Sequence, residues 1–400
     1  MTTSLRDRRF ALFALFFIPG FSLSSWVTRT PAVRDALEAS TAQMGLVLLG
    51  LSAGSMLGIL SSGPLVTRFG TRPIIVAGSV SIIASMLVTG VGSLWGVAPL
   101  VALGLALFGL GMGGGEVALN VEGADVEQGM GRAVLPAMHG FFSFGTVIGA
   151  SLGILLTAVD FPVVIHLVLV STMTLVIFVL VVGRLGAGLP PSGPTVSTQE
   201  HTARPVWRDP GLVMIGAIVL AMAFAEGTAN DWLPLVMVDG HGLAPTWGSI
   251  TYAIFAASMT VGRFAGSWIL DRVSRVNVVR ASSVAGALGL AGVIFVDNAA
   301  VAVTAVALWG LGASLGFPLA LSAAGDSGEN PAARVALVAT VGYVAFLIGP
   351  PLLGFIGEAV GLRQALIVVL VAVLLASVLA PAVRSRKTAG ASPNSQSLSA

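Results

Sequence analysis

Two pairs of acid and amide residues stand out because each pair lies inside a long apolar stretch. Glu116 precedes Asn120, and Glu226 precedes Asn230, by four residues in each case. That spacing puts both members of a pair on one face of an α-helix. A charge at the centre of a bilayer costs about 2.5 to 3.5 kcal/mol on insertion scales, so such carboxylates face a protein interior or a water-filled path. We expect both pairs to contact a proton or a small solute; the alternative for Glu116 is a solvated helix end near the cytoplasmic surface.

Four further side chains near these pairs could contribute to a site. His139 could pair with Glu116, since histidine titrates in the physiological range, and a packing role is the alternative. Asp231 and Trp232 are interpreted as an outer gate or as interfacial anchors. Arg263, within Gly-Arg-Phe-Ala-Gly, is interpreted as a brace at the cytoplasmic end of its helix, and a contact with solute is the alternative.

The composition excludes a water-soluble protein and several classes of function. Of the 400 residues, 56% are hydrophobic and 10% are charged, whereas a soluble domain is usually about one quarter charged. The absence of Cys excludes disulfides, Cys-ligated zinc and iron–sulfur clusters. No basic stripe with interleaved aromatic residues predicts nucleic-acid binding, and no P-loop predicts ATP hydrolysis. Two G-x-S-x-G sequences, at 149–153 and 312–316, lie inside apolar stretches without the strand and turn of a nucleophile elbow, so we predict neither an enzyme nor a bound cofactor.

Twelve apolar stretches are long enough to cross the hydrocarbon core, which takes a helix of about 20 residues. The predicted spans are 10–28, 42–66, 73–92, 95–121, 133–157, 161–183, 210–238, 246–270, 278–296, 299–324, 333–357 and 362–383. The first stretch follows three arginines but precedes no small-residue cleavage site, so we interpret it as a span and not as a signal peptide. The predicted fold class is an all-α membrane protein with twelve transmembrane helices.

The basic residues predict the orientation of these spans, because cytoplasmic loops carry an excess of Lys and Arg. With the N-terminus inside, three basic residues lie outside, namely Arg29, Arg34 and Arg363. Sixteen lie inside, namely Arg6, Arg8, Arg9, Arg68, Arg72, Arg132, Arg184, Arg204, Arg208, Arg272, Arg275, Arg280, Arg334, Arg384, Arg386 and Lys387. We therefore expect a multi-pass protein of the cell membrane with both termini in the cytoplasm.

The chain is predicted to contain two related halves. We expect an N-terminal six-helix bundle at 1–185, a cytoplasmic linker at 186–209, a C-terminal six-helix bundle at 210–385 and a disordered cytoplasmic tail at 386–400. A shift of 201 residues sets Gly109, Leu110, Gly111 and Gly115 on Gly310, Leu311, Gly312 and Gly316. A shift of 202 residues sets Arg132 on Arg334. Nearly constant offsets indicate a parallel duplication of six helices, an arrangement known in secondary transporters.

Glycines recur at every fourth position in two of the predicted helices. One series is Gly50, Gly54 and Gly58, and the other is Gly145, Gly149 and Gly153. This spacing lets two helices approach closely. It could serve rocking of one half against the other, or simple packing.

Residues 63–72, Gly-Pro-Leu-Val-Thr-Arg-Phe-Gly-Thr-Arg, resemble the loop between helices 2 and 3 of the major facilitator superfamily, whose pattern is G-x-L-x-D-R-x-G-R-R. Thr67 stands in place of the acid, whereas the corresponding loop of the second half keeps an acid in Asp271. The resemblance implies two pseudo-symmetric bundles of the major facilitator fold, with these loops in charge contacts on the cytoplasmic side. The resemblance implies a cytoplasmic gate made of Arg68, Arg72, Asp271, Arg272 and Arg275. Arg263 is grouped with these residues in a structural role.

The fourth predicted helix resembles a narrower group. Its segment Gly115-Glu116-Val117-Ala118-Leu119-Asn120 is similar to the E-x-A-x-N segment of fucose-permease-type sugar–proton symporters, and residues 139–145 resemble their fifth helix. This resemblance implies that Glu116 couples proton and sugar. The acid that the group carries in its first helix has no counterpart between Phe10 and Thr28.

We therefore expect a secondary active transporter that moves a small solute by alternating access, with a proton gradient as its energy source and sugar or polyol uptake as its task. One alternative is proton-coupled efflux of amphipathic compounds, which the missing Gly-Pro pair in the fifth helix disfavours. Another is a membrane sensor that transports nothing. The expected partners are the solute and the lipid bilayer, without nucleic acid, and the expected state is a monomer.

Overall fold

The computed structural model describes residues 4–131, 134–189, 206–328 and 330–384, and most of them are helical. Twelve helices of 18 residues or more are present in these ranges. Eleven of them are apolar and long enough to cross a membrane, and the remaining one is α9, Pro245–Leu270. Our predictions for Arg132, Arg204, Arg386, Lys387 and the tail at 386–400 concern residues outside the described ranges.

The first half of the chain forms six long helices and one short one. The long helices are α1 (Leu5–Val27), α3 (Thr41–Phe69), α4 (Thr71–Leu94), α5 (Ala98–Met130), α6 (Leu135–Ala158) and α7 (Val163–Val182). Helix α1 starts five residues earlier than predicted because the Ser4 hydroxyl accepts from the Asp7 amide, which caps the helix. The short helix α2 (Thr30–Ala36) was not predicted; Pro31 lies in its first turn.

The second half forms the other six long helices, which are α8 (Pro210–His241), α9, α10 (Arg275–Phe295), α11 (Ala299–Gly325), α12 (Pro331–Val360) and α13 (Leu362–Leu379). Helices α5 and α8 contain 33 and 32 residues. At 1.5 Å per residue each is about 50 Å long, so both extend beyond a hydrocarbon core of about 30 Å. Glu116 and Glu226 lie in the middle turns of these helices, away from both helix ends.

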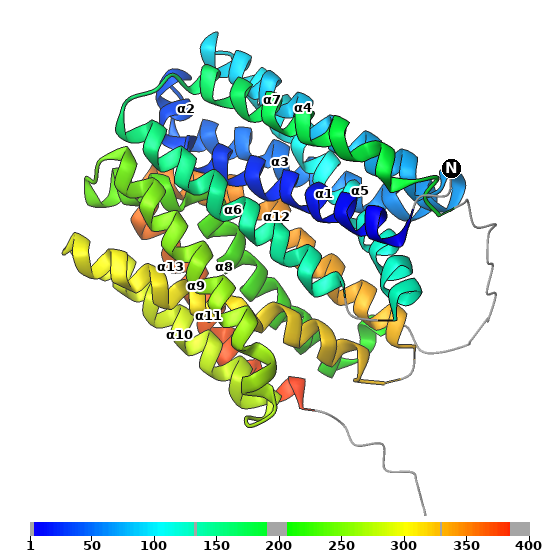
Figure 1. Cartoon of the computed structure of the whole chain (residues 1–400). Helices are drawn as coiled ribbons and strands as arrows, with labels where there is room; N and C mark the ends of the chain where they lie inside the picture. Colours follow the sequence, from blue (N-terminus) through cyan, green and yellow to red (C-terminus); the bar gives the residue numbers. More distant parts are fainter. Residues whose placement is uncertain (1–3, 132–133, 190–205, 329, 385–400) are drawn as a thin grey trace, which may run out of the picture.

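Each half packs chiefly against itself. In Figure 1, α1 to α5 and α7 lie in the upper part of the view, and α8 to α11 and α13 lie in the lower part. In the first half α5 lies between α3 and α4, and α1 lies along α6. In the second half α10 pairs with α11, and α8 contacts α12 and α13. This division agrees with two six-helix bundles of the predicted fold class. The boundaries at 185, 209 and 385 stay predictions.

The two glycine series lie within the first bundle and not between the bundles. Gly50, Gly54 and Gly58 of α3 face the backbone of α5 so closely that a Cβ atom would meet carbonyl oxygens of that helix. Gly145 and Gly149 of α6 lie equally close to α1, and Gly153 lies close to the side chain of Thr28, which follows α1. Of our two interpretations, the structure fits packing and not rocking.

The two bundles meet along α3 with α12 and along α6 with α9, and polar contacts join them at the end that carries α2. Arg34 forms an ion pair with Asp239 of α8. The amide of Ala42 donates to Glu358 Oε2 at 3.1 Å, and Ser249 Oγ donates to the carbonyl oxygen of Thr28 at 2.9 Å. We call this end the α2 end.

Within the described parts of the chain, polar contacts between the bundles are confined to the α2 end. At the opposite end, where α1 begins, no hydrogen bond or ion pair among the described residues joins the two bundles. The molecule is therefore closed at the α2 end.

Candidate functional site

Two adjoining cavities lie between the bundles. The first has a volume of about 260 Å³ and is lined by α1, α4, α5 and α6 of the first bundle and by α8 and α9 of the second. The second has a volume of about 240 Å³ and lies between α1, α3 and α5 on one side and α8 and α12 on the other. Met112, Glu116 and Glu226 line both cavities. The two carboxylates thus mark the junction of the cavities.

Glu116 lies near the middle of α5, directly after a run of three glycines. Gly113 and Gly114 let α5 approach α3, since a Cβ on Gly113 would meet the carbonyl oxygen of Ser55. The Glu116 side chain is exposed within the cavity and forms no hydrogen bond or ion pair with any described residue. A solvated helix end near the membrane surface, our alternative, does not fit a residue in the middle of the helix.

Glu226 forms an ion pair with Arg263 that crosses from α8 to α9. Arg263 Nη2 lies 3.0 Å from Glu226 Oε1, and the side chains are 48% and 16% exposed. We expected Arg263 to brace the cytoplasmic end of its helix. The structure instead places it in the lining of the first cavity, because its long side chain reaches the carboxylate of the neighbouring helix.

His139 contacts Asn120 and not Glu116. The distance between His139 Nε2 and Asn120 Oδ1 is 3.1 Å, and this contact joins α6 to α5. The imidazole also meets the ring of Phe16 edge-on, with ring centroids 5.0 Å apart. The amide of the first acid–amide pair therefore holds the histidine at the wall of the first cavity, and Glu116 stays available.

The second acid–amide pair continues into the second cavity. Asn230 and Asp231 line it, and Asp231 is only 8% exposed. Trp232 is 1% exposed and packs in the core. An interfacial anchor would contact lipid headgroups, so that interpretation of Trp232 is wrong. A gating role for Asp231 and Trp232 stays a prediction.

The loop residues predicted for a cytoplasmic gate make their contacts within a single bundle. Arg68 stacks on Phe69 at 5.1 Å, and Arg272 lies 4.3 Å from the ring of Trp268. Arg275 pairs with Asp326 at 2.8 Å, from α10 to the end of α11. For Arg72 and Asp271 no ion pair joins them to another described residue. Since no hydrogen bond or ion pair among the described residues joins the bundles at this end, a gate of this kind is not engaged in this structure.

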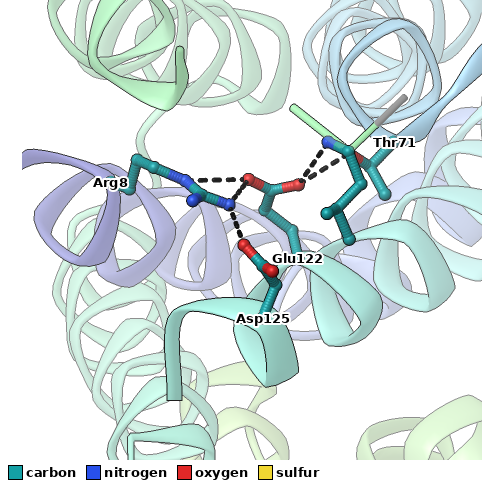
Figure 2. A network of polar contacts seen from close by, with 5 residues as sticks. Arg8, Thr71, Glu122 and Asp125 are labelled. Atoms are coloured by element: carbon teal, nitrogen blue, oxygen red, sulfur yellow. Dashed lines mark hydrogen bonds and ion pairs between the residues drawn. The ribbon is translucent and has the colours of Figure 1, made fainter. Parts of the chain in front are cut away.

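A charged network that the sequence did not predict lies at the end of α5. Arg8 of α1 pairs with Glu122 and, at 2.6 Å, with Asp125, and Thr71 Oγ1 of α4 donates to Glu122 at 2.6 Å, as Figure 2 shows. The amide of Leu189 also donates to Glu122, at 3.2 Å. The predicted span ended at residue 121, so the acids beyond it were not assigned to the helix.

A similar pair anchors the start of the second bundle. Arg334 of α12 pairs with Asp209, the residue that caps α8. The hydrogen bond from Arg334 lowers the pKa of the Asp209 carboxyl because it stabilises the charged form. Both bundles thus hold their helix ends together by an arginine and a carboxylate at the end opposite α2.

Two helical bundles with cavities between them are the architecture of polytopic membrane transporters, in which the solute site lies between the two halves. The family model of the Major Facilitator Superfamily matches residues 11–333. The chain belongs to the Major Facilitator Superfamily.

Curated relatives agree with this assignment. An uncharacterized MFS-type transporter of Yersinia pestis is 31% identical over 88% of this chain and 89% of its own length. An uncharacterized transporter of Sinorhizobium fredii is 30% identical over 92% and 96%, respectively, and the membrane protein MosC of Rhizobium meliloti is 28% identical over 89% and 85%. The chain is therefore a multi-pass membrane transporter and not an enzyme.

Solved structures share the fold at low sequence identity. A mutant of the nucleoside transporter NupG has a TM-score of 0.77 at 15% identity, covering 94% of this chain and 99% of its own. The D-xylose-proton symporter has a TM-score of 0.72 at 12% identity, with 94% and 96% covered. The Escherichia coli fucose:proton symporter has a TM-score of 0.65 at 18% identity, with 94% and 98% covered. The predicted resemblance to the superfamily is confirmed.

Proposed function

We propose that this protein is a proton-coupled transporter that takes up a small polar solute, a sugar or polyol, across the cell membrane. Its solute site is the pair of cavities between the bundles, and its proton acceptors are Glu116 and Glu226. The observation that carries this proposal is the position of both carboxylates at the junction of the cavities. Two structural neighbours named as sugar–proton symporters support it.

The two carboxylates differ in a way that suits coupling. Glu116 has no partner among the described residues, whereas Glu226 is held by Arg263 at 3.0 Å. A proton that binds Glu226 removes the charge that holds Arg263, so the guanidinium becomes free to turn toward a solute or toward Glu116 in the same cavity. Proton and solute binding would thereby change the charge balance along the line where the bundles meet.

Alternating access follows if proton and solute bind the two states with different affinities, because only such a ligand shifts the balance between them. Opening of the α2 end requires loss of the contacts made by Arg34, Ala42 and Ser249. Closure of the opposite end would bring the loops with Arg68, Arg72 and Asp271 together. We propose that the protein works as a monomer with both termini in the cytoplasm, so the α2 end faces outward.

The test is uptake of radiolabelled sugars and polyols into proteoliposomes under an imposed pH gradient. We expect the intact protein to accumulate a solute, and Glu116→Gln and Glu226→Gln to lose accumulation while retaining solute exchange without a gradient. Asp297→Asn is the control, since Asp297 is a 94% exposed acid that lines neither cavity. Gradient-driven accumulation by both glutamine variants would contradict the assignment of the proton acceptors.

A further inference from the structure

The second cavity contains a buried carboxylate without a counter-charge. Asp231 is 8% exposed, lines the cavity and forms no hydrogen bond or ion pair with any described residue. A buried carboxylate is costly unless a cation or several donors compensate it. Among the described residues, no cation and no hydrogen-bond donor contacts Asp231. The cavity therefore lacks a positive group that would compensate this carboxylate.

The charged residues that line both cavities also indicate that a positive group is missing. The acidic and arginine side chains that line them are Glu116, Glu226, Asp231 and Arg263. Arg263 is already paired with Glu226. His139, the other basic side chain of the lining, is held by Asn120 at 3.1 Å. Glu116 and Asp231 therefore remain as two carboxylates that the lining does not neutralise.

Aromatic rings complete the surroundings of Asp231. Trp26 of α1 and Tyr343 and Phe346 of α12 line the same cavity. The faces of such rings attract cations, with a gain of about 0.5 to 1 kcal/mol at exposed sites and about 2 kcal/mol where water is excluded. A carboxylate and three aromatic rings in one small cavity are groups that can recognise an ammonium ion together. Ser52, Ser55 and Asn230 add hydrogen-bonding groups to the lining.

We propose that the solute of this transporter carries an ammonium group, which binds Asp231 among Trp26, Tyr343 and Phe346. The solute is a small hydroxylated amine, such as an amino sugar or an amino polyol, and its hydroxyl groups contact Asn230 and the serines of α3. This inference rests on the proposed transport function and narrows its substrate class. It differs from protonation of Asp231 alone, which would accept a neutral solute equally well.

The experiment measures binding to the purified full chain in detergent by thermal unfolding, since a ligand of the native state raises its stability. The probes are matched pairs that differ by one ammonium group, namely D-glucosamine with D-glucose and 3-amino-1,2-propanediol with glycerol. We expect at least one amine to raise the melting temperature at a concentration where its neutral counterpart does not. The proposal would be overturned if the neutral compounds raised the melting temperature as much as the amines, or if no amine raised it.

Variants assign the effect to the cavity. Asp231→Asn keeps the shape of the side chain and is expected to weaken binding of the amine by at least about tenfold, a loss of about 1.4 kcal/mol. Phe346→Leu, which leaves every charge in place, is expected to weaken it by roughly two- to fivefold. Asp297→Asn should bind like the intact protein. If Asp231→Asn does not fold, the test rests on Phe346→Leu. The assignment is contradicted if either variant folds and binds the amine as tightly as the intact protein does.

The assay also separates this inference from the proposed transport function. Binding in detergent needs neither a membrane nor a pH gradient. Amine binding without gradient-driven uptake would leave the inference standing and reject proton-coupled transport. Gradient-driven uptake of neutral sugars without amine binding would support proton-coupled transport and reject the ammonium site.

Discussion

Arg8 ties three helices together through the buried carboxylate of Glu122. Glu122 is fully buried, and its other oxygen accepts from Thr71 and from the amide of Leu189 (Figure 2). Removing one partner of a buried ion pair costs about 3 to 5 kcal/mol, because the remaining charge stays buried without compensation. We therefore expect Arg8→Ala to lower the free energy of unfolding by about this amount, and thermal unfolding in detergent measures it.

Two variants make the Arg8 experiment specific. Arg6→Ala removes an exposed arginine of the same helix and should leave the melting temperature near that of the intact protein. The double variant Arg8→Met with Glu122→Gln removes both charges, so we expect it to be more stable than Arg8→Ala. Equal melting temperatures of Arg8→Ala and Arg6→Ala would show that the network contributes no stability.

The sequence could identify single residues but not their partners. Glu116 and Glu226 stood out because a carboxylate in an apolar helix needs a polar surrounding. The pairing of Glu226 with Arg263 joins faces of two helices, and spacing along one helix carries no information about a neighbouring helix. His139 was expected beside Glu116 but lies beside Asn120, a difference of one helical turn that only packing decides.

Helix α3 offers a direct comparison of a packed and an open glycine. A Cβ on Gly54 would collide with the carbonyl oxygen of Ala106 in α5, whereas a Cβ on Gly63 would meet nothing within 4 Å. We expect Gly54→Ala to destabilise the protein, because α3 must move away from α5 or strain its backbone, at a cost of about 1 to 3 kcal/mol. Thermal unfolding of the purified variant measures this loss.

Gly63→Ala is the matched control, since both glycines are helical residues of α3. Alanine is favoured over glycine in a helix by about 0.5 to 1 kcal/mol, so this variant should be as stable as the intact protein or slightly more so. If Gly54→Ala were also neutral, the close approach of α3 and α5 would have no energetic role.

Long elements were predictable, while their ends and the short helix were not. The predicted span at 73–92 lies within α4, Thr71–Leu94, because a run of apolar residues determines both. Helix α5 continues to Met130, nine residues beyond the predicted end, because Glu122 and Asp125 find a partner in Arg8. Helix α2 spans seven residues, too few for a hydrophobic period to show.

At the scale of the whole molecule, the nearly constant sequence offsets between the halves predicted the duplication. The sequence did not predict at which end the two halves contact each other. The same sequence must form both states of a transporter that works by alternating access. The closed α2 end depends on a contact of two helices from different bundles, in which a Cβ on Gly45 would lie 2.8 Å from the carbonyl oxygen of Pro350. Gly354 of α12 is similarly close to α3, since a Cβ on Gly354 would lie 3.0 Å from the Cα of Gly45.

Gly45→Leu should therefore keep the α2 end from closing, because its side chain would fill the space where α3 meets α12. The readout is the labelling of a single cysteine in a chain that has none, introduced as Ser249→Cys at a buried position that contacts the other bundle. We expect a polar maleimide to react slowly with Ser249→Cys alone and much faster when Gly45→Leu is added. Gly63→Leu in the same background is the control, since its side chain would enter open space. Equal labelling rates with Gly45→Leu and Gly63→Leu would contradict the view that the approach of α3 to α12 holds the α2 end closed.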